Sequence, residues 1–247
     1  MWKNLNVSVY DLFGYFLPGA VTLAALFIFW ASGDLERRCP PTVISGSIWV
    51  VLGIIAYFLG HLVQAIANLI EGILCLDQLT FNKPRTKWEH FIHFIFFKDK
   101  PVPDWVRQQA EKKVREKFDP QLQNFPIDDH SLAKISEQAL VMEDHADDRE
   151  IYVYREGFYR GSAIAFVILA VALASALLLT LFAPHLKAGM EACSTGVRMG
   201  VGVLSAAFLI SLLASFLSFR RFVHFHYLLR VTSLMAFVLL KSKTASA

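Results

Sequence analysis

The sequence predicts an all-α membrane protein with four transmembrane helices, a small helical insert and a C-terminal amphipathic helix. Of its 247 residues, 55% are hydrophobic and only 18% are charged, whereas soluble proteins carry about 25% charged residues. Four long stretches contain no Asp, Glu, Lys or Arg, and each exceeds the roughly 20 residues that cross a bilayer as a helix. This composition excludes a disordered chain and a disulfide-rich secreted domain.

The expected spans are residues 12–33, 45–70, 162–184 and 199–219. A single charge at mid-span costs about 3 kcal/mol, so the absence of charge from all four stretches favours insertion. They divide the chain into a first hairpin (1–71), an insert (72–161), a second hairpin (162–219) and a basic tail (220–247). We expect an uncleaved first span, because its apolar stretch is longer than that of a usual signal peptide.

The tail holds a fifth apolar segment, Phe222 to Leu240, in which His226, Arg230 and Ser233 share one helical face. We expect an amphipathic helix at the membrane surface or docked on the bundle, and a fifth span remains the alternative. The basic residues of the tail, expected to face lipid headgroups, are Arg220, Arg221, Arg230, Lys241 and Lys243. An ordinary excess of positive charge on the cytoplasmic side explains the same residues.

The insert is predicted to hold two helices. Asp104 is a suitable N-cap for the first, which ends at Asp119-Pro120. Its apolar stripe is Val106, Ala110, Val114 and Phe118, and its i, i+4 charge pairs are Glu111–Arg115 and Lys112–Glu116. The second helix begins near Asp128 or Asp129, with Leu132, Ile135 and Ala139 facing inward. No stretch alternates long enough to predict a sheet.

Charge distribution predicts the orientation. With four spans, the N-terminus, the insert and the tail share one side of the membrane, and they hold twenty of the 24 Lys and Arg residues. The positive-inside rule then places both termini on the cytoplasmic side of the membrane. The insert itself is nearly neutral, so no nucleic-acid binding is expected.

One polar face stands out in the second span. His61, Gln64, Asn68 and Glu71 are spaced three, four and three residues apart, which places them on one side of a helix. Polar side chains in a membrane helix normally face a bundle interior, a water-filled cavity or another subunit. The face therefore indicates a hydrated path or a polar helix interface. The alternative is that the helix leaves the bilayer near Gln64.

Three further sets of residues are candidates for structural roles. Asp11 precedes the first span, and we expect it to pair with Arg155 or Arg160 before the third. Pro18 and Gly19 are expected to kink the first span, as a fixed bend or a hinge. Cys39 and Cys193 lie in the two outer loops, where an oxidising compartment would allow a disulfide.

Motifs for catalysis are absent from the sequence. The string Trp88-Glu-His-Phe-Ile-His93 has the wrong order and spacing for a zinc protease site. There is also no phosphate-binding loop and no nucleophile elbow. We therefore expect no enzymatic activity and no cofactor.

Two short segments carry a family resemblance. Tyr10-Asp-Leu-Phe-Gly-Tyr-Phe-Leu-Pro-Gly19, together with Gly60-His-Leu-Val-Gln64, resembles bacterial four-span proteins, some of which look like membrane components of anti-phage defence systems. The resemblance implies an oligomeric inner-membrane protein that senses infection or disrupts the membrane with a cytoplasmic protein partner. The alternative function is a small ion channel or transporter that uses the polar face of the second span.

Overall fold

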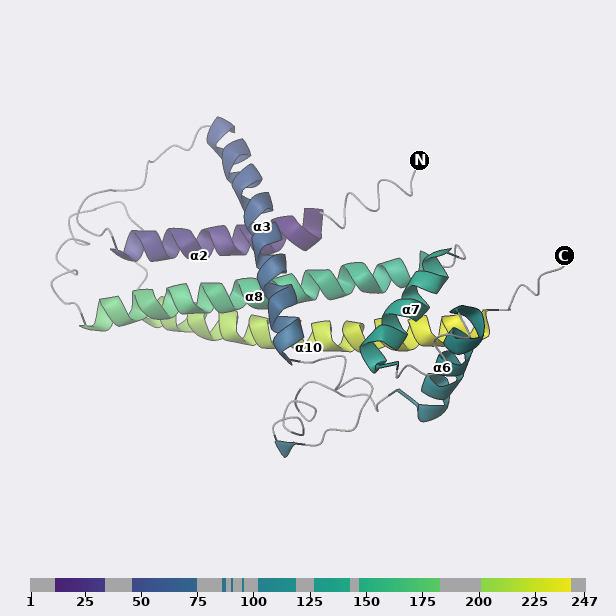
Figure 1. The fold of residues 1–247 in the computed structure, drawn as a ribbon. Coiled ribbons are helices and arrows are strands. Elements are labelled where there is room, and N and C mark those ends of the chain that lie inside the picture. The colour runs from purple at the N-terminus through teal and green to yellow at the C-terminus, as the bar shows by residue number, and fades with distance from the viewer. Residues whose placement is uncertain are drawn as a thin grey trace. The chain divides into compact units, whose positions relative to one another are not determined.

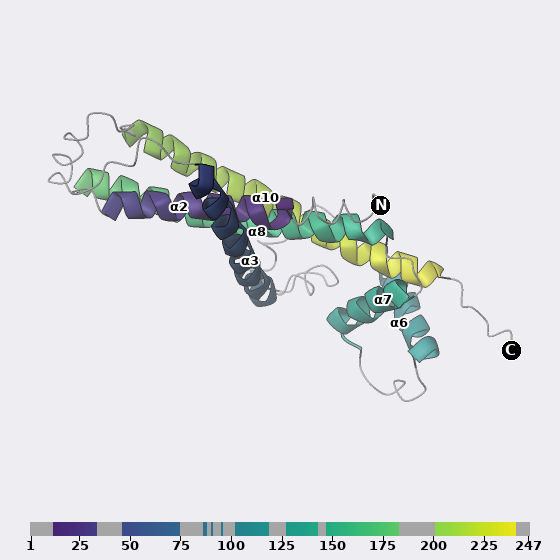
Figure 2. The same ribbon diagram turned by 90° about the horizontal axis from the view of Figure 1, so that it is seen from above.

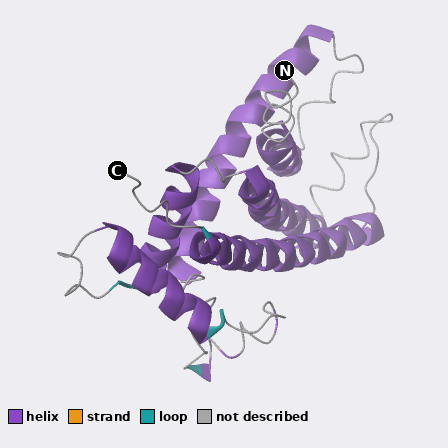
Figure 3. Cartoon of the chain, turned by 90° about the vertical axis from the view of Figure 1, so that its right-hand side faces the viewer, coloured by secondary structure: helices purple, strands orange, loops and turns teal. Residues whose placement is uncertain are grey.

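The computed structural model describes residues 12–33, 46–74, 102–118, 127–142, 147–182 and 201–240, together with 86–87, 90 and 95. Within these residues the chain forms six α-helices and one π-helical turn, and it contains no strand (Figure 3). The all-helical fold class is confirmed. Four helices are long and apolar enough to cross a membrane, so the protein is a multi-pass membrane protein with four candidate spans.

The first hairpin begins with a π-helical turn, η1 (Leu12–Phe16), which leads directly into α2 (Leu17–Gly33). The partner helix is α3 (Gly46–Leu74), which crosses α2 (Figure 1). Pro18 has no N–H to donate to the carbonyl four residues earlier, so a regular α-helix cannot continue unchanged through this point. The change from π-helix to α-helix falls between Phe16 and Leu17, directly before Pro18.

The last two long helices exceed the predicted spans. They are α8 (Asp147–Phe182) and α10 (Val201–Leu239). The sequence predicts a span at 199–219 and a separate amphipathic helix after it, but α10 continues through both without a break. The physical reason is that no glycine or proline occurs after Gly202 within this helix.

The chain separates into two compact units. The bundle unit comprises Met1–Leu69 and Gly157–Phe219, and the insert unit comprises Ile70–Glu156 and Arg220–Ala247. The basic tail, expected to form a segment of its own, therefore belongs to the same unit as the insert. Residues of α3, α8 and α10 contribute to both units.

The insert unit contains both predicted insert helices, α6 (Asp104–Phe118) and α7 (Asp129–Met142), which lie side by side (Figure 2). Of their predicted inward positions, those of Val106, Ala110, Val114, Leu132 and Ala139 are buried and Ile135 is partly buried, while the side chain of Phe118 lies outside the described residues. The C-terminal part of α10 completes the core. The fully buried members of this core include Val106, Ala110, Val114, Leu132, Ala139, Leu234 and Phe237. The predicted ion pairs also form, at 2.7 Å for Glu111–Arg115 and 3.8 Å for Lys112–Glu116.

Polar groups fix the ends of two helices in the insert unit. The side chain of Asp128 accepts a hydrogen bond from the backbone N–H of Ser131 at 2.9 Å, which caps α7 as expected for an N-cap aspartate. Lys113 of α6 donates to the carbonyl oxygens of Val238, at 3.0 Å, and of Leu240. A cation at a helix C-terminus satisfies carbonyls that have no helical donor, so Lys113 anchors the end of α10 to α6.

Small residues allow close helix packing in the bundle unit. A Cβ on Gly19 would collide with the backbone carbonyl of Ala56, and a Cβ on Gly60 would collide with the backbone of Tyr15. Glycine at both positions therefore permits η1 and α2 to touch α3 backbone to backbone. On the other side of this unit, Ser215 of α10 donates to the carbonyl of Ala163 in α8 at 3.0 Å.

Candidate functional site: a buried glutamine and a Glu–His cluster

Gln64 is the only member of the predicted polar face that is buried, with 8% of its surface exposed. Its side-chain Nε2 donates to the carbonyl oxygen of Gly14 at 3.1 Å and to that of Gly157 at 2.6 Å. These two carbonyls belong to η1 and α8, so one side chain of α3 binds two other helices of the bundle unit. We call Gln64, Gly14 and Gly157 the Gln64 clamp.

The local sequence explains why the clamp forms. Gly14 lies four residues before Pro18, which cannot supply the backbone donor that an α-helix would give the Gly14 carbonyl. The amide of Gln64 supplies a donor to this oxygen instead. On the α8 side, a Cβ on Gly161 would lie too close to the Gln64 amide nitrogen, so glycine at this position lets the amide keep its present place.

The other three residues of the predicted polar face lie in different environments. His61 is exposed to solvent or lipid, and its ring stacks on Tyr15 with a centroid distance of 4.0 Å. Asn68 is also exposed, one helical turn beyond Gln64. Glu71 belongs to the insert unit, where it meets residues of other helices. The four residues share one helical face, as predicted, but the structure does not gather them into one site.

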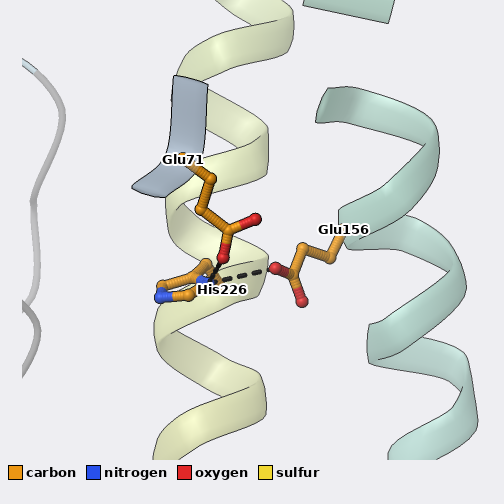
Figure 4. A group of neighbouring side chains, drawn as sticks. All are labelled: Glu71, Glu156 and His226. Atoms are coloured by element: carbon orange, nitrogen blue, oxygen red, sulfur yellow. Dashed lines mark hydrogen bonds and ion pairs between the residues drawn. The ribbon is translucent and has the colours of Figure 1, made fainter. Parts of the chain in front are cut away.

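Glu71 takes part in a compact group with Glu156 and His226, which we call the Glu–His cluster (Figure 4). The imidazole Nδ1 of His226 lies 3.0 Å from Oε1 of Glu156 and 3.6 Å from Oε1 of Glu71. The His226 side chain is completely buried, and the side chains of Glu156 and Glu71 are 9% and 19% exposed. Two carboxylates and an imidazole thus converge in a largely dry environment.

Each member of the cluster comes from a different helix of the insert unit: Glu71 from α3, Glu156 from α8 and His226 from α10. In the sequence, each lies within seven residues of the end of an uncharged stretch. Groups that bind metal ions in proteins are of this kind, since imidazole nitrogen and carboxylate oxygen are both ligands for divalent ions. Without an ion, the same atoms form a hydrogen-bonded ion pair when the imidazole is protonated.

Arg230 lies one helical turn after His226, and its position differs from the prediction. It was expected to face lipid headgroups, but it is 9% exposed and its Nη1 lies 2.6 Å from Oε1 of Glu137 in α7. A buried guanidinium needs an acidic partner, and Glu137 provides one within the insert unit. Arg230 therefore ties α10 to the insert and does not contribute to a lipid-facing surface.

The structure describes only some of the residues predicted to form the ion pair, the disulfide and the basic tail. Arg155 lies over the ring of Phe225, at 5.5 Å from its centroid, and Arg160 is half-buried in the bundle unit. Arg220 is half-buried and Arg221 is exposed, so a lipid-facing role for Arg221 stays a prediction. The remaining predicted residues, Asp11, Cys39, Cys193, Lys241 and Lys243, lie outside the described residues. The expected interfacial ion pair and disulfide thus stay predictions.

Sequence reasoning missed Glu156 and Glu137. Glu156 lies six residues before the third uncharged stretch, and Glu71 lies directly after the second. In a four-span topology these two ends lie on the same side of the membrane, as does the segment after the fourth span that contains His226. Glu71, Glu156 and His226 are therefore expected at a similar distance from the membrane, and this is the sequence signal that could have connected them.

The chain was compared with protein-family models, curated proteins and solved structures, and none of them matches it.

Proposed function

We propose that this multi-pass membrane protein is a non-enzymatic, oligomeric component of a bacterial defence or stress system. It acts in the inner membrane as a sensor or effector, and its insert unit engages a cytoplasmic protein partner. The resemblance of residues 10–19 and 60–64 to membrane components of anti-phage systems supports the defence role.

The observation that carries the coupling role is the continuity of α8 and α10. Each is a single helix with residues in the bundle unit and in the insert unit. An unbroken helix transmits displacement along its axis better than a flexible linker, because its backbone hydrogen bonds resist bending. A change at one end of such a helix thus has a rigid element through which to act on the other.

Exposed apolar side chains on the insert helices favour a protein partner. Trp105 of α6 is 60% exposed, and Val141 and Met142 of α7 are 55% and 78% exposed. Trp and Met are enriched at protein–protein interfaces relative to the rest of protein surfaces, which supports a protein partner for the insert.

The alternative function, a small channel or transporter, requires a hydrated path along the polar face of α3. Gln64 lies in the middle of that face, and its amide nitrogen donates hydrogen bonds to the carbonyl oxygens of Gly14 and Gly157. A buried amide that is hydrogen-bonded to the backbone of other helices is typical of a structural contact and not of a hydrated path. This favours the sensor or effector role. Conductance of the purified protein in planar bilayers, without any partner, would favour the channel.

An infection assay tests the proposal. Bacteria that lack the chain are transformed with wild-type protein or with empty vector and challenged with a panel of phages. We expect a fall in plaque number of at least about tenfold for one or more phages. A photo-reactive residue at Met142 should crosslink a cytoplasmic protein, whereas the same residue at Lys112, an exposed position with a charged side chain, serves as the matched control.

Two results would contradict the proposal. One is equal plaque counts with and without the protein for every phage and also under membrane stress. The other is a crosslinking pattern at Met142 that is indistinguishable from that at Lys112. Either result, combined with measured ion flux, would assign the chain to the channel class.

A further inference from the structure

We propose that the Glu–His cluster is a binding site for a divalent transition-metal ion of the Zn²⁺ class. Glu71, Glu156 and His226 each offer one ligand atom, and these atoms lie within 4.8 Å of one another. The site is independent of the proposed defence function, because it is argued from geometry inside the insert unit alone.

The distances match the spacing of ligands around one ion. Bonds of about 2.1 Å at angles of about 90–110° place neighbouring ligand atoms about 3.0–3.4 Å apart. The two distances from Nδ1 of His226 are 3.0 Å to Glu156 and 3.6 Å to Glu71, and all three ligand atoms lie within 4.8 Å of one another, so side-chain rotation of the two glutamates is enough to bring them around one ion. Figure 4 shows both carboxylates directed toward the same edge of the imidazole.

The donor set selects the class of ion. One imidazole nitrogen with carboxylate oxygens suits Zn²⁺ and neighbouring divalent metals, whereas Ca²⁺ takes six to eight oxygen ligands and Mg²⁺ retains several waters. Two ionised carboxylates also match the charge of a divalent cation. Three protein ligands leave at least one coordination position for water or for a further ligand.

Burial distinguishes this group from an ordinary surface cluster. His226 is completely buried, and the two acidic side chains that approach its Nδ1 are at least four-fifths buried. An ion bound there loses most of its hydration and replaces it with protein ligands from α3, α8 and α10. Binding therefore ties three helices together and stabilises the folded insert unit by mass action.

The test is metal binding by full-length protein purified in detergent without a polyhistidine tag. Cys39, Cys75 and Cys193 are replaced by Ser, so that thiols cannot bind the metal. After treatment with a chelator, the protein is titrated with Zn²⁺ and with Co²⁺, whose visible spectrum reports its ligands, and Mg²⁺ serves as the hard-cation control. We expect one Zn²⁺ per chain and a rise in the thermal midpoint on binding.

Three variants and one control locate the site. We expect Glu71→Gln, Glu156→Gln and His226→Gln each to weaken Zn²⁺ binding by at least about tenfold. His224→Gln, two residues away on the same helix, should bind like the parent. If a buried variant fails to fold, Glu71→Gln decides the matter, since Glu71 is the most exposed of the three ligands.

The proposal is overturned by absence of stoichiometric Zn²⁺ binding in the parent, in which case the cluster is an ion pair only. It is also overturned by Zn²⁺ binding that survives Glu71→Gln at the affinity of the parent, because the ion then binds elsewhere. Neither result affects the infection assay, so failure of the metal site and failure of the proposed function are distinguishable.

Discussion

The side-chain nitrogen of Gln64 lies 3.1 Å from the carbonyl oxygen of Gly14, four residues before a proline that cannot donate to that oxygen. A polar residue in the second span thereby compensates for a defect in the backbone of the first. The same nitrogen reaches the carbonyl of Gly157, 93 residues away in the sequence. Gln64 thus joins three helices of the bundle unit through one amide group.

Replacement of Gln64 by leucine should destabilise the bundle unit. The substitution removes a donor from the part-buried carbonyl oxygens of Gly14 and Gly157, and Gly14 cannot obtain another donor from Pro18. The loss of a hydrogen bond to such a carbonyl costs about 1–3 kcal/mol. Unfolding in mixed micelles by titration with a denaturing detergent measures the loss. Asn68→Leu, on the same face but exposed, is the matched control and should change stability by less than about 0.5 kcal/mol. Equal effects of the two substitutions would argue against the clamp.

Alanine at Gly60 should separate η1 from α3. The added Cβ meets backbone atoms of Tyr15, which cannot rotate away as a side chain can, and overpacking of this kind costs about 1–3 kcal/mol. Gly53→Ala on the same helix is the control, because its nearest neighbour is a ring carbon of Phe16 at 3.8 Å. Thermal unfolding in detergent should show a loss for Gly60→Ala alone. An equal loss of thermal stability in both variants would show that the effect comes from helix propensity and not from packing against Tyr15.

The Arg230–Glu137 pair should behave as a buried ion pair. Both side chains are nearly buried, at 10% and 13% exposure, so Arg230→Met, which removes the guanidinium that lies against the Glu137 carboxylate, should cost about 3 kcal/mol. The double variant Arg230→Met, Glu137→Met should recover most of this loss, which a double-mutant cycle measures. Lys112→Ala, in a pair whose side chains are at least 64% exposed, should cost under about 0.5 kcal/mol. Strict additivity of the two single variants would show that the pair does not couple.

The C-terminal part of α10 should be required for a stable insert unit. Leu234 is completely buried against α6 and α7, and truncation of a core leucine to alanine costs about 2–5 kcal/mol. Limited proteolysis should therefore cleave the insert of Leu234→Ala faster than that of the wild type. Leu239→Ala, at a position that is 79% exposed, should be cleaved at the wild-type rate. If Leu234→Ala were cleaved at the wild-type rate, the result would contradict the packing of the tail into the insert core.

Local features of the fold could be predicted from the sequence. The insert helices follow from the cap at Asp128, from the acidic residue Asp104 in the first turn of α6, and from the spacing of Val106, Ala110 and Val114, all of which act within a few turns. The four spans could be predicted because four stretches of more than 20 residues contain no charged side chain. The continuation of α10 could not be predicted from Arg220-Arg221, because charge marks where a helix leaves lipid and not where its backbone ends.

The candidate sites depend on contacts that periodicity does not reveal. Spacing places Gln64 and Glu71 on one face of α3 but cannot name the helices that meet them. Glu156 and His226 are 70 residues apart, and their contact depends on how α8 and α10 pack in the insert unit. Helical periodicity assigns a residue to a face, and only the packing of several helices brings such faces together.

Membrane topology tests the account most directly, because the insert unit contains both the insert and the tail. In a background without Cys39, Cys75 and Cys193, single cysteines are introduced at Glu36, Lys112 and Met235 and labelled with a membrane-impermeant thiol reagent in intact and opened cells. We predict that Lys112→Cys and Met235→Cys label only in opened cells and that Glu36→Cys labels in intact cells. Labelling of Lys112→Cys and Met235→Cys from opposite sides would contradict the four-span fold.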